Sequence, residues 1–149
     1  MKVADWMDRG HPGVSPATTL GELLVDLLRH NLNGVAVVDG RAALLGIVTL
    51  SDLRRQLLPS PEELHREPGL VHDLDFMERR FRQVAARPVD SVMTRDVATI
   101  GPSQPLLQAG AILNARRVKQ LPVVERGHLV GMISPRDIAW AFLTASRPG

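Results

Sequence analysis

The chain has 149 residues, a formal net charge of +2 and no cysteine. This length can bury enough apolar surface for one compact body, and the missing cysteine excludes disulfides, thiolate metal sites and a thiol nucleophile. Because the apolar run from Ala42 to Val48 is too short to cross a bilayer and the N-terminus lacks a secretory signal, we expect a cytoplasmic protein with no membrane partner.

Signals for a strand and a helix follow each other near the N-terminus. A short segment around Val14 has the character of a strand. The sequence from Thr19 to Glu22 has a capping-box pattern, in which a hydroxyl and a carboxylate satisfy backbone N–H groups at a helix start. Apolar residues then recur at helical spacing, which predicts a helix with one apolar face: Leu20, Leu23, Leu24, Leu27 and Leu28.

A hairpin and a second helix complete this first unit. Val35 to Val38 and Leu44 to Val48 have the pattern of buried strands, and Asp39-Gly40 between them is typical of a tight turn. A helix is predicted from Ser51 to Leu58. We assign residues 1–58 to this unit.

A segment of different character, residues 59–88, follows. Four prolines interrupt it, and a helix is predicted where apolar residues recur at Leu74, Met77, Phe81 and Val84. Such a helix either packs its apolar face on the core of the protein, which is the commoner case, or protrudes and docks a second subunit. The sequence leaves both alternatives open.

Residues 89–149 repeat the order of the first unit. Val97 to Ile100 has the pattern of a strand, and a helix follows it. Leu121 to Val124 and Leu129 to Ile133 form the next predicted hairpin, and a last helix is predicted from Pro135 to Leu143. Each unit therefore has the order strand, helix, strand, strand, helix.

The two units also correspond residue by residue. The offset is 86 residues at first, so that Met7 corresponds to Met93, and it becomes 85 by Gly46, which corresponds to Gly131. A unit of about 55 residues is marginal by itself, so we expect two repeats that share one core. The predicted fold class is α+β: a pseudo-twofold pair of repeats, with a helical connector and a cleft on each side of the axis.

Two polar pairs recur between a strand and a helix: Thr49 with Asp52, and Ser134 with Asp137. Either pair can be explained as a capping box alone. A helix N-terminus also offers free N–H groups to phosphates, and a carboxylate can accept hydrogen bonds from a ribose diol. The glycine before each pair lets a backbone or a flat ligand approach the strand, so the pattern favours a nucleotide over a metal.

The positive charge is concentrated in the second repeat. Residues 89–149 carry seven basic and four acidic side chains, whereas residues 1–58 carry six of each. An excess of three is too small for a nucleic-acid footprint, so we expect no nucleic-acid partner. It is enough to favour a phosphorylated small molecule in one cleft.

The repeated segments resemble the cystathionine-β-synthase (CBS) domain family, in the form of a tandem CBS pair. The residues that carry the resemblance are Gly46 to Asp52, Gly131 to Asp137 and the run from Arg116 to Val124. The resemblance implies two βαββα repeats packed through their sheets. It also implies a regulatory module that binds AMP, ADP or ATP, or else NAD or S-adenosylmethionine, and passes the ligand state to a protein partner.

Carried onto this chain, the resemblance assigns roles to ten residues. Ribose or phosphate oxygens would be held by Thr49, Asp52, Ser134 and Asp137. Phosphates would be met by Arg117, Lys119 and Arg136, the adenine by the backbone around Leu121 and Pro122, and either group by Thr99.

The first repeat has neutral residues where the second has cations. Asn31 and Asn33 correspond to Arg117 and Lys119, and Ser51 corresponds to Arg136. We therefore expect phosphate to bind in the cleft of the second repeat, beside Asp137. The cleft of the first repeat would be empty, or would bind a ligand whose charge is met from the other repeat.

We expect no enzyme. The five histidines have no metal-ligand spacing and are interpreted as surface residues, and neither a Gly-rich phosphate loop nor a paired-carboxylate motif is present. No catalytic residue, metal site or required cofactor is predicted. The alternative to a nucleotide sensor is a structural dimerisation module without a ligand. A homodimer is expected, with its seam at the last helix of each repeat: Leu53, Leu57, Ile138, Ala141 and Phe142.

Overall fold

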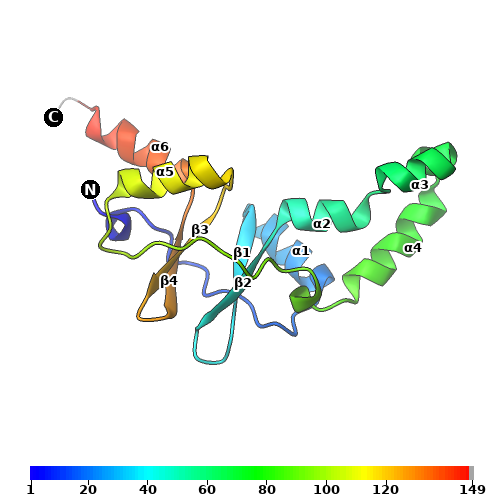
Figure 1. Cartoon of the computed structure of the whole chain (residues 1–149), viewed down its shortest axis with the longest axis horizontal. Helices are drawn as coiled ribbons and strands as arrows, with labels where there is room; N and C mark the ends of the chain where they lie inside the picture. Colours follow the sequence, from blue (N-terminus) through cyan, green and yellow to red (C-terminus); the bar gives the residue numbers. More distant parts are fainter. Residues whose placement is uncertain (148–149) are drawn as a thin grey trace.

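The structure is a computed structural model that describes residues 1–147 (Figure 1). Its helices and strands are α1 (Leu20–Arg29), β1 (Gly34–Val38), β2 (Leu44–Thr49), α2 (Leu50–Leu57), α3 (Pro61–Arg66), α4 (Leu74–Ala85), α5 (Leu106–Arg116), β3 (Leu121–Glu125), β4 (His128–Ile133) and α6 (Pro135–Ala145). Three short 3-10 segments join them: η1 (Val3–Asp5), η2 (Pro68–His72) and η3 (Val89–Ser91).

The predicted α+β fold of two repeats is confirmed. In each repeat two antiparallel strands form a hairpin, β1 with β2 and β3 with β4. The first strand expected in each repeat is reduced to a single residue, Val14 or Ile100, bridged in parallel to the hairpin. Pro16 and Pro102 follow two residues later, and a proline cannot donate to a sheet ladder, so neither segment extends.

The two hairpins lie side by side at the centre of the molecule, with α1 and α2 beyond one of them and α5 and α6 beyond the other (Figure 1). A small apolar cluster joins the repeats where their sheets meet. Its buried members are Ala36 and Ile47 from the first repeat and Met132 from the second. Each repeat also has its own larger core between its hairpin and its helices.

Each of these larger cores contains residues from outside the repeat. Val3 and Met7, near the N-terminus, are buried in the core of the second repeat. Val84, near the end of the connector, and Val89, at the start of the second repeat, are buried in the core of the first. The two repeats have therefore exchanged their N-terminal segments. Residues at the start of the chain complete the core of the second repeat, and residues around the end of the connector complete the core of the first.

Backbone pairing accompanies this exchange. Asp8 exchanges both of its backbone hydrogen bonds with Met132 of β4, at 2.8 and 2.9 Å, and Thr94 does the same with Ile47 of β2, at 2.9 Å each. A Cβ added at Gly46 would lie 2.7 Å from the carbonyl oxygen of Thr94, and one at Gly131 would lie 3.0 Å from that of Asp8. The glycine that precedes each polar pair thus admits a crossing backbone.

The connector protrudes instead of packing its apolar face on the core. Figure 1 shows α3 and α4 extending away from the two hairpins. Only Val84 of the predicted stripe is buried, whereas Leu74, Met77 and Phe81 are 71%, 60% and 45% exposed. Helix α3 was not predicted, although Ser60, Pro61 and Glu63 form a capping box with proline at the first helical position.

Two residues of the expected dimer seam face inward. Leu53 is 2% exposed and Ala141 is fully buried, each in the core of its own repeat. Phe142 is exposed.

Within residues 1–147, no helix has both the length and the apolar character needed to span a membrane.

Candidate functional site

Both recurring polar pairs form capping boxes at the start of a helix. In the first, the backbone N–H and the hydroxyl of Thr49 donate to Oδ2 of Asp52 at 2.8 and 2.9 Å, and the N–H of Asp52 donates to the hydroxyl at 3.2 Å. Ser134 and Asp137 repeat the first two bonds at the same distances. The capping interpretation therefore describes both pairs correctly, and any ligand must use the remaining lone pairs of each carboxylate.

The two carboxylates differ in their surroundings. Asp52 also bonds the guanidinium of Arg55, three residues along α2. At the corresponding place in α6 stands Trp140, which has no charge. Burial raises the pKa of Asp137 above its ordinary value, and the nearby Asp8 adds to the rise, while hydrogen bonds from Ser134 and the charge of Arg136 act in the opposite direction.

Because the folded-state pKa of Asp137 is raised, we expect Asp137→Asn to change how stability depends on pH. The protonated form stabilises the folded chain below the ordinary aspartate pKa, and this contribution is lost as the pH rises through the folded-state value. The parent should therefore lose stability relative to Asp137→Asn over that interval. Urea unfolding of both chains from pH 3 to pH 7 measures the difference, and two parallel curves would contradict the expectation.

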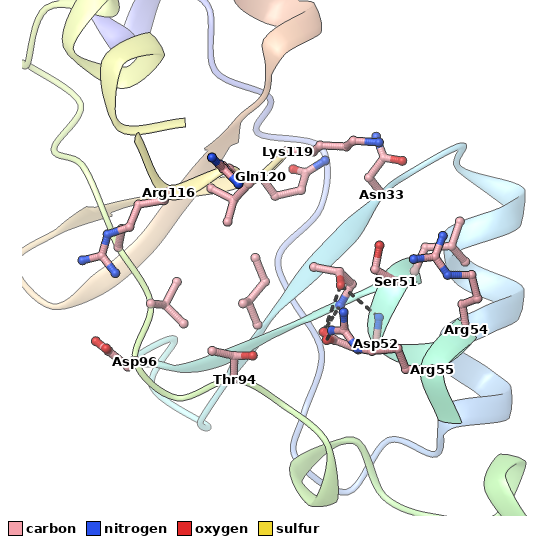
Figure 2. A pocket seen from close by; sticks show the side chains of 17 residues that line it. Asn33, Ser51, Asp52, Arg54, Arg55, Thr94, Asp96, Arg116, Lys119 and Gln120 are labelled. Atoms are coloured by element: carbon pink, nitrogen blue, oxygen red, sulfur yellow. Dashed lines mark hydrogen bonds and ion pairs between the residues drawn. The ribbon is translucent and has the colours of Figure 1, made fainter. Parts of the chain in front are cut away.

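The larger cleft, which we call the Asp52 cleft, has a volume of about 550 Å³. One wall is the start of α2, with Thr49, Asp52, Arg54 and Arg55. The opposite wall comes from the segment between α5 and β3 in the second repeat, residues 116–120 (Figure 2). Thr94 and residues 96–98 form the third side. The cleft thus lies between the repeats, and both contribute to it.

Basic side chains from both repeats line the Asp52 cleft. There are five of them against two acidic ones: Arg54, Arg55, Arg116, Arg117 and Lys119 against Asp52 and Asp96. In Figure 2, Lys119 lies across the cleft from the α2 residues, while Arg116 lies toward the end where Asp96 is found. Cations gathered around a helix N-terminus attract an anionic ligand.

The smaller cleft, which we call the Asp137 cleft, has a volume of about 280 Å³. It is lined by Ser134, Arg136, Asp137 and Trp140 of α6 and its cap, and by residues 30–36 of the first repeat. Asp8 adds a second carboxylate. One arginine facing two carboxylates does not make an environment that favours phosphate.

A pair of histidines lies on the rim of the Asp137 cleft. His11 bonds Oδ2 of Asp26 through Nε2 at 2.6 Å, and His30 lies 2.9 Å from Oδ1 of the same carboxylate. The side chain of His11 is only 16% exposed, so this histidine is not the surface residue that its sequence context suggested. Within residues 1–147, no group of three or more His, Cys, Asp or Glu side chains has an arrangement that could hold a metal ion.

We expected three cations in one cleft, and the structure places them in two different clefts. Arg117 and Lys119 line the Asp52 cleft, whereas Arg136 lines the Asp137 cleft with Ser134 and Asp137. The sequence grouped them because they belong to one repeat. The first-repeat cleft has basic residues from the other repeat, as the second alternative requires, in which a ligand's charge is met from that repeat.

Three other expected site residues line neither of the two clefts. Leu121 and Pro122 are buried in β3, and Thr99 is exposed on the segment before Ile100. The apolar residues that do line the Asp52 cleft include Ile47, Val97 and Ala98, which were not singled out. Arg54 and Arg55 were also missed, although they lie two and three residues after Asp52 on the predicted helix.

The conformation of Arg117 is unusual for an arginine. Its backbone is left-handed, with φ 54° and ψ 43°, and it ends α5. The corresponding Asn31 has a φ of 52° and lines the other cleft. Asparagine tolerates this region, whereas a long side chain there costs about 1 kcal/mol or more.

Comparison with known proteins agrees with this architecture. The chain is 30% identical over 160 aligned residues to the chloride channel protein CLC-f of Arabidopsis thaliana, and the match covers 96% of this chain but only 18% of that protein. The crystal structure of CBSX2 in complex with AMP superposes with a TM-score of 0.74 at 23% identity, over 98% of each chain. The CBS domain pair of MJ0100, in complex with 5′-methylthioadenosine and S-adenosyl-L-methionine, gives a TM-score of 0.69 at 19% identity, also over 98% of each chain.

The family assignment rests on the sequence of both repeats. The sequence model of the CBS domain matches residues 3–59 and 89–144, which is more than half of the chain. These two matches, together with the paired hairpins and their capping boxes, place the protein: it belongs to the CBS domain family.

Proposed function

We propose that this chain is a regulatory module that binds an adenosine-containing nucleotide in the Asp52 cleft. The observation that carries the proposal is the position of Arg117 and Lys119, which belong to the second repeat but line a cleft built on Thr49 and Asp52 of the first. The cleft volume of about 550 Å³ lies within the range of small-molecule sites.

Each part of a nucleotide has a suitable partner in this cleft. The positive dipole end of α2, together with the basic side chains, suits phosphates, although the amides of Thr49, Leu50 and Asp52 already have hydrogen-bond partners. Asp52 suits the ribose hydroxyls, and Arg55, which bonds Asp52 in the structure, can turn to a phosphate when a diol replaces it. The apolar surface of Ile47, Val97 and Ala98 suits the flat face of an adenine.

The solved relatives support the class of ligand. One was crystallised with AMP, and another with 5′-methylthioadenosine and S-adenosyl-L-methionine. All three ligands contain the adenosine group, and they differ in charge. For this chain we propose that the Asp52 cleft takes ATP, ADP or AMP. The Asp137 cleft, with its two carboxylates, suits an adenosine compound without phosphate.

Helix α2 connects the proposed site with the connector. It begins at the capping box in the cleft, and its last turn contacts the base of the projecting helices. The guanidinium of Arg80 in α4 donates to the carbonyl oxygens of Gln56 and Leu58, both at 3.4 Å, and Arg87 donates to the side chain of Gln56 at 3.0 Å. We propose that ligand state passes to a partner along this helix.

A nucleotide panel tests the proposal. We expect ATP to stabilise the chain more than AMP, and AMP more than adenosine, because each phosphate adds contacts to the basic wall. A ligand at 100 times its dissociation constant stabilises by about 2.7 kcal/mol, which a thermal-shift measurement detects easily. The preference for ATP over adenosine should narrow as salt rises from about 0.05 to 0.5 M. Equal affinity for ATP and adenosine would defeat the role given to the cations.

The structural alternative is a dimerisation module without a ligand. It is favoured by the capping boxes, which already give both carboxylates hydrogen-bond partners. The same panel separates the two functions. If AMP, ADP, ATP, NAD, S-adenosylmethionine and adenosine all leave the melting temperature unchanged at millimolar concentration, the structural alternative stands and the nucleotide site does not.

A further inference from the structure

The projecting part of the connector, which we call the arm, consists of α3, η2 and α4. The arm is internally ordered: Arg80 of α4 forms an ion pair with Glu63 of α3, and its guanidinium lies 4.7 Å from the centre of the Phe76 ring. The ion pair joins the two helices of the arm, and the contact with Phe76 lies within α4. They leave the outer face of α4 open.

That outer face has an apolar stripe with the spacing of a helix–helix contact. Leu74, Met77 and Phe81 follow one another at intervals of three and four residues, and each is at least 45% exposed. The a and d positions of a coiled coil have this spacing, and such a seam is normally covered by a second helix. Exposed apolar stripes of this kind mark interaction sites.

The charges beside the stripe indicate which helix covers it. On one side of the stripe lie Asp75, Glu78 and Arg82, so that the acidic residues are nearer the start of α4 and the basic residue nearer its end. None of the three forms an ion pair within residues 1–147. If two copies of α4 pack antiparallel, this side of one helix meets the same side of the other in reverse order. Asp75 of each copy then lies beside Arg82 of the other.

A parallel arrangement is less favourable. With Leu74 and Phe81 at a positions and Met77 at d, it would place Glu78 at an e position of one copy beside Asp73 at a g position of the other, and both are acidic. From the stripe and the charge order together, we infer that α4 binds α4 of a second copy of this chain, antiparallel and about a twofold axis near Glu78. In this register Met77 of one copy packs against Phe81 of the other.

Two consequences follow from the twofold axis. The two Glu78 side chains come close to each other, so Glu78→Gln should strengthen the association. The contact is also small, because only a few apolar side chains from each copy take part. We therefore expect a dimer of micromolar or weaker affinity, at the low end of specific interfaces.

Charge exchange tests this arrangement in the full chain. Sedimentation equilibrium of the parent should show a monomer–dimer equilibrium between about 10 µM and 1 mM. Asp75→Arg and Arg82→Asp should each weaken it about five- to tenfold, since each converts two attractive pairs into two repulsive ones. The double variant Asp75→Arg with Arg82→Asp should regain the parent affinity, because both pairs are restored with the signs exchanged.

One further variant, Met77→Glu, distinguishes a dimer formed through α4 from a dimer formed through another surface. Met77→Glu should abolish the dimer, while the exposed position keeps the fold intact, as circular dichroism and the melting temperature verify. A chain that is monomeric at 1 mM overturns the inference. So does a dimer that Met77→Glu leaves unchanged, or a double variant that stays as weak as the single ones.

Discussion

Replacing Arg117 and Lys119 together by asparagine should weaken ATP binding about 30- to 100-fold and leave adenosine binding unchanged. A hydrogen bond to a charged group contributes about 1.5 to 3 kcal/mol, and both side chains are partly screened by solvent, so about 2 to 2.7 kcal/mol is expected for the pair. Isothermal titration calorimetry measures both affinities. The variant carries the residue types that the first repeat has at the same places, Asn31 and Asn33.

The stability of this variant should not fall. Because Arg117 is left-handed, asparagine at this position relieves backbone strain, and the free energy of unfolding should stay the same or rise by up to about 1 kcal/mol. The chain offers a matched control in Arg126, which has a φ of 51° and lies outside both clefts. Arg126→Asn should have a similar effect on stability and none on ATP affinity. If it weakens ATP binding as much as the double variant, the loss reflects net charge and not the cleft.

Gly46→Ala should destabilise the chain by about 1 to 3 kcal/mol. The added Cβ would lie 2.7 Å from the carbonyl oxygen of Thr94 and 2.9 Å from Sδ of Met93, so either the crossing backbone or β2 must move. Overpacking of a filled site costs this much. For a domain of this size, it lowers the melting temperature by several degrees. Since Thr94 also lines the Asp52 cleft, ATP affinity should fall as well.

Alanine substitutions at two further glycines serve as comparisons for the loss of stability at Gly46. At Gly131 the atom nearest an added Cβ is Sδ of Met7 at 2.8 Å, which belongs to a flexible side chain, and the backbone oxygen of Asp8 is farther away at 3.0 Å. Gly131→Ala should therefore cost less than Gly46→Ala. At Gly69 nothing lies within 4 Å, and Gly69→Ala should change the free energy of unfolding by less than about 0.5 kcal/mol. Equal losses at Gly46 and Gly69 would mean that the crossing segment does not constrain Gly46.

Local patterns in the sequence were enough to predict the elements and the order of the fold. The leucine spacing from Leu20 to Leu28 predicted α1, and Asp39-Gly40 between apolar runs predicted the β1–β2 hairpin, because both signals depend only on near neighbours. The capping boxes at Thr49 and Ser134 were predicted for the same reason. The family resemblance then supplied the packing of the two repeats through their sheets.

The composition of each cleft was not predictable in this way. Lys119 and Asp52 are far apart in sequence, and whether they meet depends on how the two sheets face each other across the pseudo-twofold axis. A cation in one repeat was therefore assigned to the cleft of that repeat. The exchange of Met7 and Met93 between cores was missed for the same reason, since a buried methionine shows no sequence signal for which core it enters.

The central claim is that one nucleotide contacts both repeats in the Asp52 cleft. A backbone-amide NMR titration with ATP tests it most directly in this chain of 149 residues. We expect the amides of residues 49–52 and of residues 117–120 to shift together, with a single dissociation constant. Shifts confined to residues 30–36 and 134–140, which line the Asp137 cleft, would contradict the claim, and so would shifts in only one of the two expected segments.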